Sequence, residues 1–158
     1  MVIDIRKEAL ESAVPQALIG ELNAELTERY SEPGVNYFRL DPEEVAPGRG
    51  AFLVAYAAEQ PVGCGAVRLI DSSTAEIKRM YVRPAQRGQG IARQVLEALE
   101  AEARLLGVAR IRLETGTRQP EAIALYSKAG FSPTAPFGEY EPSSLTVFME
   151  KQCEPRSG

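Results

Sequence analysis

The sequence predicts an α/β domain with a mixed, mostly antiparallel sheet, a parallel pair of strands at its centre and helices on both faces. Three β-rich segments follow one another with short turns, which is typical of an antiparallel meander. A long amphipathic pattern then separates the third segment from another β-rich one. Strand, long helix and strand imply a right-handed crossover between parallel strands. At 158 residues, the chain is long enough for one domain with a sizeable core.

The first elements are a strand and a helix. Alternating apolar and polar residues predict a strand over residues 2–6. Ser12 can cap a helix that should end near Tyr30, before a Pro-Gly turn. Residues 35–50 carry three turn signals and are predicted to form a mobile connection. Its residues 37–39 (Tyr-Phe-Arg) could line a pocket or anchor the loop to the core.

The central elements form the meander and the crossover. Residues 51–58, 62–70 and 74–82 are predicted as three antiparallel strands, and Gly63 and Gly65 suggest a bulge or a close backbone approach in the second. Apolar residues trace one helical face from Ile91 to Gly107, which should end the helix. A short strand is expected over residues 109–113. A second helix from Gln119 or Pro120 to Gly130 and strands over 131–136 and 145–149 complete the sheet.

A glycine-rich turn between the third strand and the long helix is a candidate anion site. Gly88 and Gly90 leave backbone N–H groups unobstructed, and a helix N-terminus adds unpaired N–H groups and partial positive charge. Arg87 and Arg93 flank this helix start, although cations there cost roughly 0.3–1 kcal/mol each, which favours a bound anion. The alternative is an ordinary cap of a surface helix. The better-known G-x-x-x-x-G-K-[ST] and G-x-G-x-x-G loops do not match.

Composition limits the kinds of catalytic site, metal site and partner that the chain can have. The chain contains no histidine, which excludes Ser-His-Asp and Cys-His catalysis and histidine metal sites. A net charge of −4 argues against nucleic acid or an anionic membrane as the main partner. The two cysteines have no metal-like spacing, so no metal is expected. No transmembrane or signal segment is apparent, and reduced thiols fit a cytoplasmic protein.

Three motifs in order resemble the GCN5-related N-acetyltransferase (GNAT) family, which binds acetyl-coenzyme A. Residues 87–92 (Arg-Gly-Gln-Gly-Ile-Ala) are similar to its R/Q-x-x-G-x-G/A pyrophosphate loop. Residues 77–84 resemble the splayed strand that precedes the loop. Residues 122–131 resemble its A-x-x-L-Y-x-x-x-G-F helix and strand. The resemblance implies the GNAT-like acyl-CoA N-acyltransferase fold, a single acetyltransferase domain over residues 1–152 and a polar C-terminal tail over 153–158.

The resemblance also implies which residues contact the coenzyme. Backbone groups of the splayed strand would hold the acetyl and pantetheine arm, and amides and arginines of the loop would hold the pyrophosphate. Gln119 stands where many relatives have an asparagine that contacts the coenzyme. The implied coenzyme-binding residues are Met80, Tyr81, Val82, Arg87, Gly88, Gln89, Gly90, Ile91, Ala92, Arg93 and Gln119.

The implied reaction is direct attack of an amine on the thioester, which needs a base for the amine proton. Glu76 is the first candidate because its segment resembles that of the base glutamate in histone acetyltransferases of the family; the alternative is an ion pair with Lys78 or Arg68. Glu114, near the end of its strand, is the second. Tyr126 would protonate the departing thiolate, or else it only packs on its helix. Cys64 is expected to be a buried apolar residue.

Several functions fit these expectations. The leading one is acetyl-CoA-dependent N-acetylation of a small-molecule amine. A groove open to peptide would instead indicate a protein acceptor, and a pocket capped by residues 37–39 and 137–140 would indicate a small molecule. A non-catalytic acyl-CoA-binding module that regulates a partner is the alternative outside the enzyme class. Homodimers are common in the resembling family.

Overall fold

The computed structural model describes residues 2–29, 40–135 and 146–153. A seven-stranded sheet with the strand order β1-β2-β3-β4-β5-β7-β6 organises the chain. Its pairs are antiparallel except β4 with β5, so the predicted mixed sheet with a central parallel pair is confirmed. The strands are β1 Ile3–Lys7, β2 Gly50–Ala57, β3 Gln60–Asp71, β4 Thr74–Val82, β5 Arg110–Gly116, β6 Ser132–Pro133 and β7 Thr146–Gln152.

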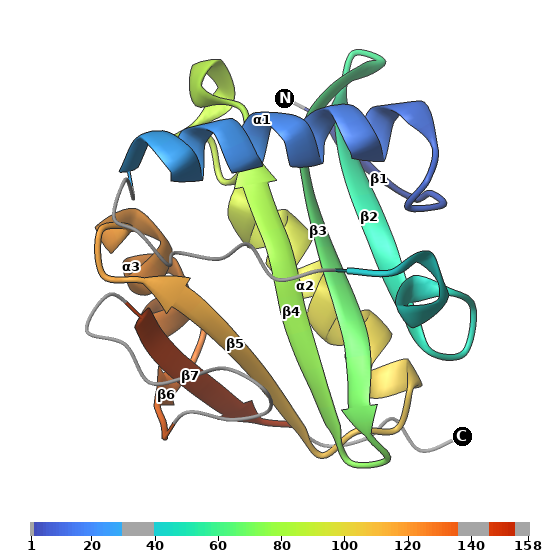
Figure 1. Cartoon of the computed structure of the whole chain (residues 1–158), viewed down its shortest axis with the longest axis vertical. Helices are drawn as coiled ribbons and strands as arrows, with labels where there is room; N and C mark the ends of the chain where they lie inside the picture. The colour runs from blue at the N-terminus through green and yellow to red at the C-terminus, as the bar shows by residue number, and fades with distance from the viewer. Residues whose placement is uncertain (1, 30–39, 136–145, 154–158) are drawn as a thin grey trace.

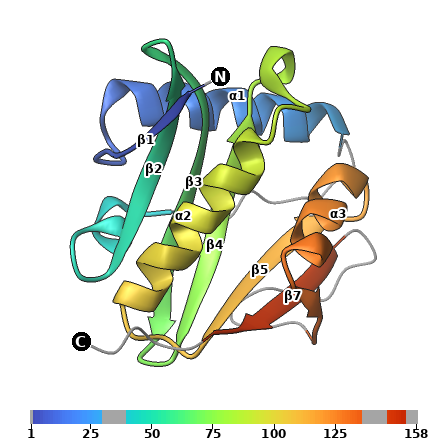
Figure 2. The ribbon, with the colours of Figure 1, turned by 180° about the vertical axis from the view of Figure 1, so that it is seen from behind.

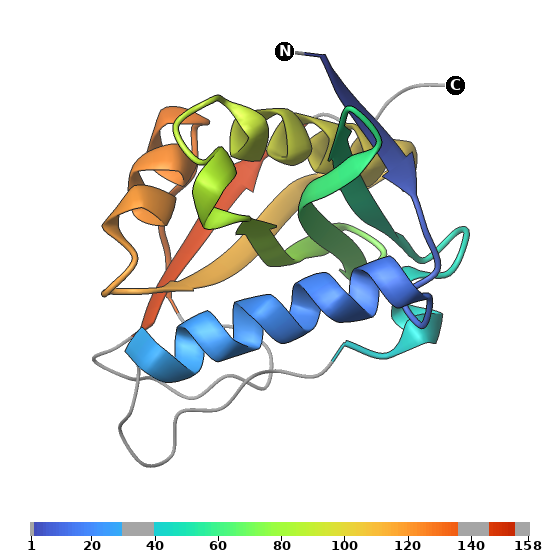
Figure 3. The same ribbon diagram turned by 90° about the horizontal axis from the view of Figure 1, so that it is seen from above.

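Helices cover both faces of the sheet, as predicted. α1 (Ala13–Arg29) lies across one face, and α2 (Ile91–Leu105) and α3 (Pro120–Lys128) lie on the other (Figures 1 and 2). Seen from above, the molecule has three layers: α1, the sheet, and α2 with α3 (Figure 3). Two short 3-10 helices, η1 (Pro42–Val45) and η2 (Pro84–Gln86), precede β2 and α2.

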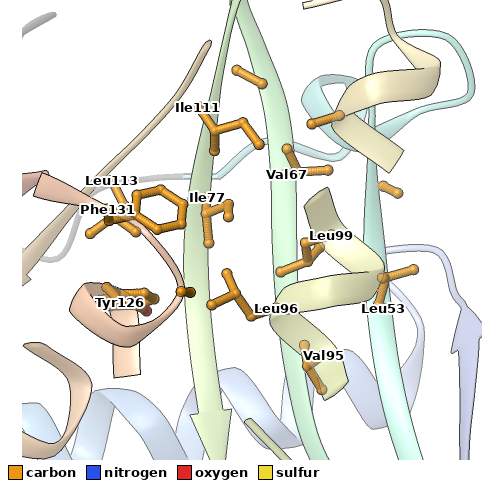
Figure 4. Close-up of a cluster of buried hydrophobic side chains, with 14 of the residues drawn as sticks. Leu53, Val67, Ile77, Val95, Leu96, Leu99, Ile111, Leu113, Tyr126 and Phe131 are labelled. Carbon is orange, nitrogen blue, oxygen red and sulfur yellow. The ribbon is translucent and has the colours of Figure 1, made fainter. Parts of the chain in front are cut away.

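The core is divided by the sheet. The larger cluster packs β2–β5 and β7 against α2 and α3 and includes Leu53, Ile77, Leu99, Leu113 and Tyr126 (Figure 4). The smaller one packs α1 against the opposite face of β2, β3 and β4. Successive strand residues therefore alternate between the two clusters, which fixes the face of every polar residue between them.

The parallel pair splays at a defined residue. β4 and β5 pair from Thr74 with Arg110 to Ile77 with Leu113, and the ladder then stops. Just beyond, β4 carries one extra residue relative to β3, and Arg79 there has a φ of 58°. Such a bulge bends its strand and locally increases the twist. The bulge therefore begins where β4 leaves β5, and the resulting gap is at the carboxyl ends of both strands (Figure 1).

Glycine lets α2 approach the sheet closely. A Cβ on Gly65 would lie 2.7 Å from Leu99 Cδ1 of α2 and 2.7 Å from Met80 Sδ. The close approach suggested by the sequence is confirmed at this position. This close contact fixes the position of α2, and of the turn that leads into it, relative to the sheet.

Element lengths differ from expectation mainly at the end of the sheet. β5 continues three residues beyond the predicted 113, to Gly116, because β7 pairs with it along its whole length. β6 is only two residues long. Cys153, the first residue of the predicted tail, donates its amide to Ala109 O at 2.9 Å and packs against the core. The tail from 154 and the proposed pocket-capping residues 37–39 and 137–140 lie outside the described residues.

Candidate active site

The glycine turn presents a row of backbone amides. Gly88 and Gly90 have φ angles of 81° and 80°, a region that costs other residues about 1–2 kcal/mol. Gly90 directly precedes α2 and offers no side-chain cap. Within the described part of the chain, no backbone carbonyl accepts a hydrogen bond from the amides of residues 88–93. Six adjacent donors, the partial positive charge of the helix end and the absence of an acid in its first turn make an anion site.

The two arginines of the turn differ in their contacts. Arg87 donates through Nε to Val82 O at 2.9 Å and through Nη2 to Glu25 Oε1 of α1 at 2.7 Å. Its guanidinium is therefore fixed beside the turn. Arg93 points outward from α2 and pairs with Glu97, four residues later on the same helix, at 3.0 Å. Of the two, Arg87 is better positioned to meet an anion on the amides.

The splayed part of β4 leaves one backbone edge open. Tyr81 and Val82 pair with β3 on one side, but among the described strands none pairs with the β5-facing side of residues 79–82. Tyr81 is buried against α1, and Met80 and Val82 face α2. An extended ligand arm could add to this open edge as a strand would. The arrangement fits the predicted backbone contacts of Met80, Tyr81 and Val82.

Glu76 is held in an ion pair. Its side chain is 1% exposed, and its Oε1 lies 2.9 Å from Arg68 Nε and 2.8 Å from Arg68 Nη2. Arg68 also contacts Glu44 of η1. The ion pair with Arg68 considered for this residue is therefore present. The Oε1 atom of Glu76 is therefore already engaged by Arg68.

Glu114 lies in a different environment. It is two residues beyond Arg112 on β5, at the start of the splay and on the α1 face. Burial is the main reason that its pKa rises to about 7; the charge of Glu76 raises it further, while Lys78 and Arg79 lower it. A carboxyl with this pKa is half ionised at neutral pH, which suits a general base. Sequence reasoning ranked Glu114 below Glu76, and burial at a strand end is the feature it missed.

Tyr126 comes to the same region from α3. Its ring is 5% exposed and meets Phe131 edge-on, with ring centroids 5.9 Å apart. Burial, and then the charge of Glu114, raise the pKa of its hydroxyl. The phenol therefore stays protonated at neutral pH and can only donate a proton. Tyr126 lies on the α2/α3 face of the sheet and Glu114 on the α1 face, and the two act electrostatically on each other.

Two further candidates have local roles. Gln119 Oε1 accepts the Gly116 amide at 3.3 Å and closes the turn between β5 and α3. Cys64 is fully buried, its Sγ lies 3.4 Å from Arg79 O, and burial raises the pKa of its thiol. This is the environment of the predicted buried apolar cysteine rather than of a reactive thiolate.

No pattern in the sequence predicts the contacts that join α1 to the site. Arg83 pairs with Glu21 at 2.8 Å, and Arg79 donates to Asn23 at 3.2 Å. Neither pair is close in sequence. Among the described residues, no group of three or more His, Cys, Asp or Glu is arranged to hold a metal ion. None of the described helices is long and apolar enough to span a membrane.

Comparison with known proteins matches this geometry to a family. The model of the acetyltransferase (GNAT) family matches residues 16–131. The chain is 43% identical over 147 residues to an IAA acetyltransferase from Azospirillum brasilense, covering 92% of this chain and 94% of the relative. It is 35% identical over 103 residues to the uncharacterized N-acetyltransferase YsnE of Bacillus subtilis, covering 64% of this chain and 68% of the relative.

Solved structures agree in fold. One from Klebsiella pneumoniae, assigned to the acyl-CoA N-acyltransferases, superposes with a TM-score of 0.80 at 36% identity and covers 95% of this chain and 97% of its own. A PaiA N-acetyltransferase from Thermoplasma acidophilum, in complex with coenzyme A, superposes with a TM-score of 0.71 at 20% identity, covering 97% of this chain and 100% of its own. With the amide cradle and the splayed strands, these matches show that the chain belongs to the GNAT family of acetyl-CoA-dependent N-acetyltransferases.

Proposed function

We propose that this enzyme transfers the acetyl group of acetyl-CoA to a primary amine of a small molecule by direct attack on the thioester. The observation that carries the proposal is the position of Glu114, whose carboxyl group lies just beyond the last paired residues of β4 and β5 and acts electrostatically on the phenol of Tyr126. Burial, which raises the pKa of Glu114 to about 7, suits it to this role. A module that only binds acyl-CoA has no need of a base and an acid there. The amides of residues 88–93 and Arg87 would hold the pyrophosphate.

Glu114 is proposed as the base in place of Glu76. A protonated amine must lose a proton before its nitrogen can attack the thioester carbon. Glu114 accepts that proton directly or through a water molecule, while a C–N bond forms and the carbonyl electrons move to oxygen. The Met80 or Tyr81 amide on the open edge of β4 would stabilise the resulting oxyanion.

Collapse of this intermediate re-forms the carbonyl and breaks the C–S bond. Tyr126 gives its proton to the sulfur as negative charge develops there. Because burial raises the pKa of Tyr126, this transfer is uphill to a thiol of pKa about 8.5 and occurs only as the bond breaks. The nitrogen, which is positively charged after the attack, releases its second proton as the amide forms. Glu114 passes the proton it took to solvent, and the Tyr126 phenolate takes one proton back, so the net products are an N-acetylated amine, free coenzyme A and one proton.

The name of one relative favours a small-molecule acceptor. The Azospirillum protein, which this chain matches over almost its whole length, is named for the acceptor IAA and not for a protein. The acceptor class remains part of the proposal, and the screen that tests it includes IAA, small primary amines, amino acids, and peptides with free N-terminal or lysine amines.

The test is an acceptor screen with acetyl-CoA that follows free thiol release. We expect turnover with a small amine, and a loss of kcat of about 100-fold in both Glu114→Gln and Tyr126→Phe with unchanged acetyl-CoA affinity. Turnover confined to peptides would overturn the small-molecule assignment. Tight acetyl-CoA binding without turnover on any acceptor would instead support a binding module. A Glu114→Gln variant with full activity would exclude Glu114 as the base.

A further inference from the structure

Two glutamates and two cations lie together on the α1 face of the parallel pair, two on β4 and two on β5. Ala75 and Ile77 of β4, and Ile111 and Leu113 of β5, face the larger core cluster. The alternate residues therefore face α1, and register places Glu76 opposite Arg112. Lys78 and Glu114 come two residues further along the same strands. Glu76 is thus the diagonal neighbour of Glu114 on the adjacent strand, two positions further from the open splay.

Arg68 forms a buried ion pair with Glu76. Burying a charge is costly unless an opposite charge compensates it. Arg68 of β3 contacts Glu76 with two nitrogens, at 2.9 and 2.8 Å, and contacts Glu44 on its other side. Arg112, which lies opposite Glu76 on β5, binds Glu150 of β7 at 2.8 Å.

We propose that Glu76 is a positioning residue for acetyl transfer: clamped by Arg68, it places a fixed negative charge diagonally across from Glu114 on the same face of the sheet and so sets how strongly Glu114 holds the substrate proton. The inference rests on the proposed function of Glu114. It gives the buried Arg68–Glu76–Glu44 cluster a role in the reaction without requiring that any of its members touch the substrate.

The other groups around Glu114 do not replace that charge. On β4, Lys78 and Arg79 act in the opposite direction and lower the pKa of Glu114. On β7, the residue paired with Glu114 is Phe148, which is uncharged. From α3, Tyr126 contributes a neutral phenol. From α1, Asn23 accepts a hydrogen bond from Arg79. Glu76 is the one neighbouring acid that favours the protonated form of Glu114 among the charges that act on it in the described chain.

The test compares pH–rate profiles of matched charge-removal variants. Glu76→Gln keeps an oxygen that can accept from Arg68 but removes the negative charge. In the pH profile of kcat/KM, the rise at acidic pH reports ionisation of Glu114. In Glu76→Gln the midpoint of this rise should move to lower pH by about 1 unit. Glu76→Asp, which restores the charge, should return the midpoint toward the wild-type value. Glu44→Gln removes the same charge from the far side of Arg68 and should leave the midpoint unchanged.

A second measurement does not depend on turnover. The carboxyl carbon of Glu114, assigned by its loss in Glu114→Gln, can be titrated by NMR in the free protein. A midpoint that falls in Glu76→Gln and stays in Glu44→Gln supports the proposal. Equal midpoints in wild type and Glu76→Gln overturn it, even if Glu114→Gln is inactive. Full activity of Glu114→Gln would instead defeat the proposed base, so the two failures are distinguishable.

Discussion

At the scale of single residues, two carboxyl groups on neighbouring strands differ because of their partners. Both Glu76 and Glu114 are polar residues between apolar ones on central strands. Glu76 meets Arg68 at hydrogen-bonding distance. Within the described part of the chain no cation donates a hydrogen bond to Glu114, which is left with the cost of burial. The same burial that suits Glu114 to catalysis should also make folding depend on pH.

Glu114 should reduce stability as pH rises. Its pKa is about 7 in the folded chain against an ordinary value of 4.5, so the folded state binds the proton more tightly. Its favourable contribution is complete below pH 4.5 and is lost as pH rises through 7. The free energy of unfolding of Glu114→Gln should therefore exceed that of wild type by about 1–3 kcal/mol at pH 8, and by less at pH 5. Urea unfolding at both pH values measures this, and an equal difference at both would contradict it.

At the scale of elements, much of the site is a consequence of patterns that the sequence displays. The period-2 strands, the stripe of α2 and the stops at Gly107 and Gly130 predicted the element order and the place of the glycine turn. The bulge at Arg79 carried no such signal, because a positive φ at arginine arises from the mismatch between β3 and β4. The extra length of β5 likewise depends on pairing with β7, which is distant in sequence.

The glycine turn allows a test that separates strain from ligand binding. Gly90 and Gly107 have nearly equal φ angles, 80° and 83°, and a Cβ at either would meet no described atom within 4 Å. Alanine at either position should cost about 1–2 kcal/mol of stability from backbone strain alone. Only Gly90→Ala should also weaken the binding of coenzyme A, by about tenfold or more, because its methyl group would enter the anion site formed by the amides of residues 88–93.

Thermal unfolding and calorimetric titration with coenzyme A measure the two effects separately. Gly20→Ala, within α1, serves as a third variant because its Cβ is also unobstructed in a helical conformation. Gly20→Ala should increase stability by up to about 1 kcal/mol and leave the affinity for coenzyme A unchanged. Equal coenzyme affinities in Gly90→Ala and Gly107→Ala would show that the turn does not hold the ligand.

At the scale of the whole molecule, α1 joins the two arms of the splay. On the β4 side, Glu21 binds Arg83 and Glu25 binds Arg87. On the β5 side, Arg29 at the end of α1 pairs with Glu121 of α3 at 2.6 Å, and Arg118 donates to Arg29 O at 2.9 Å. The helix thus crosses the open end of the sheet and is fixed at both sides (Figures 1 and 3). Sequence patterns place α1 on a face but do not pair its charges with residues some 60 positions away.

This arrangement puts a negative charge next to the proposed pyrophosphate site. Glu25 Oε1 lies 2.7 Å from Arg87 Nη2, so part of the positive charge that would attract an anion is already compensated. Glu25→Gln keeps an oxygen that can accept from Arg87 and removes the charge. Coenzyme A should then bind about 2- to 5-fold more tightly at low salt, a gain of about 0.5–1 kcal/mol that shrinks as salt screens it.

The matched control is Glu28→Gln, the same charge change on an exposed position of the same helix. If net charge alone governed coenzyme affinity, both variants would bind equally well. A local competition for Arg87 requires that only Glu25→Gln gain affinity, and that the gain disappear in the double variant Glu25→Gln/Arg87→Gln. Weaker binding in Glu25→Gln would mean that the ion pair serves to aim Arg87 at the ligand, and that α1 contributes to the coenzyme site by holding its arginine in place.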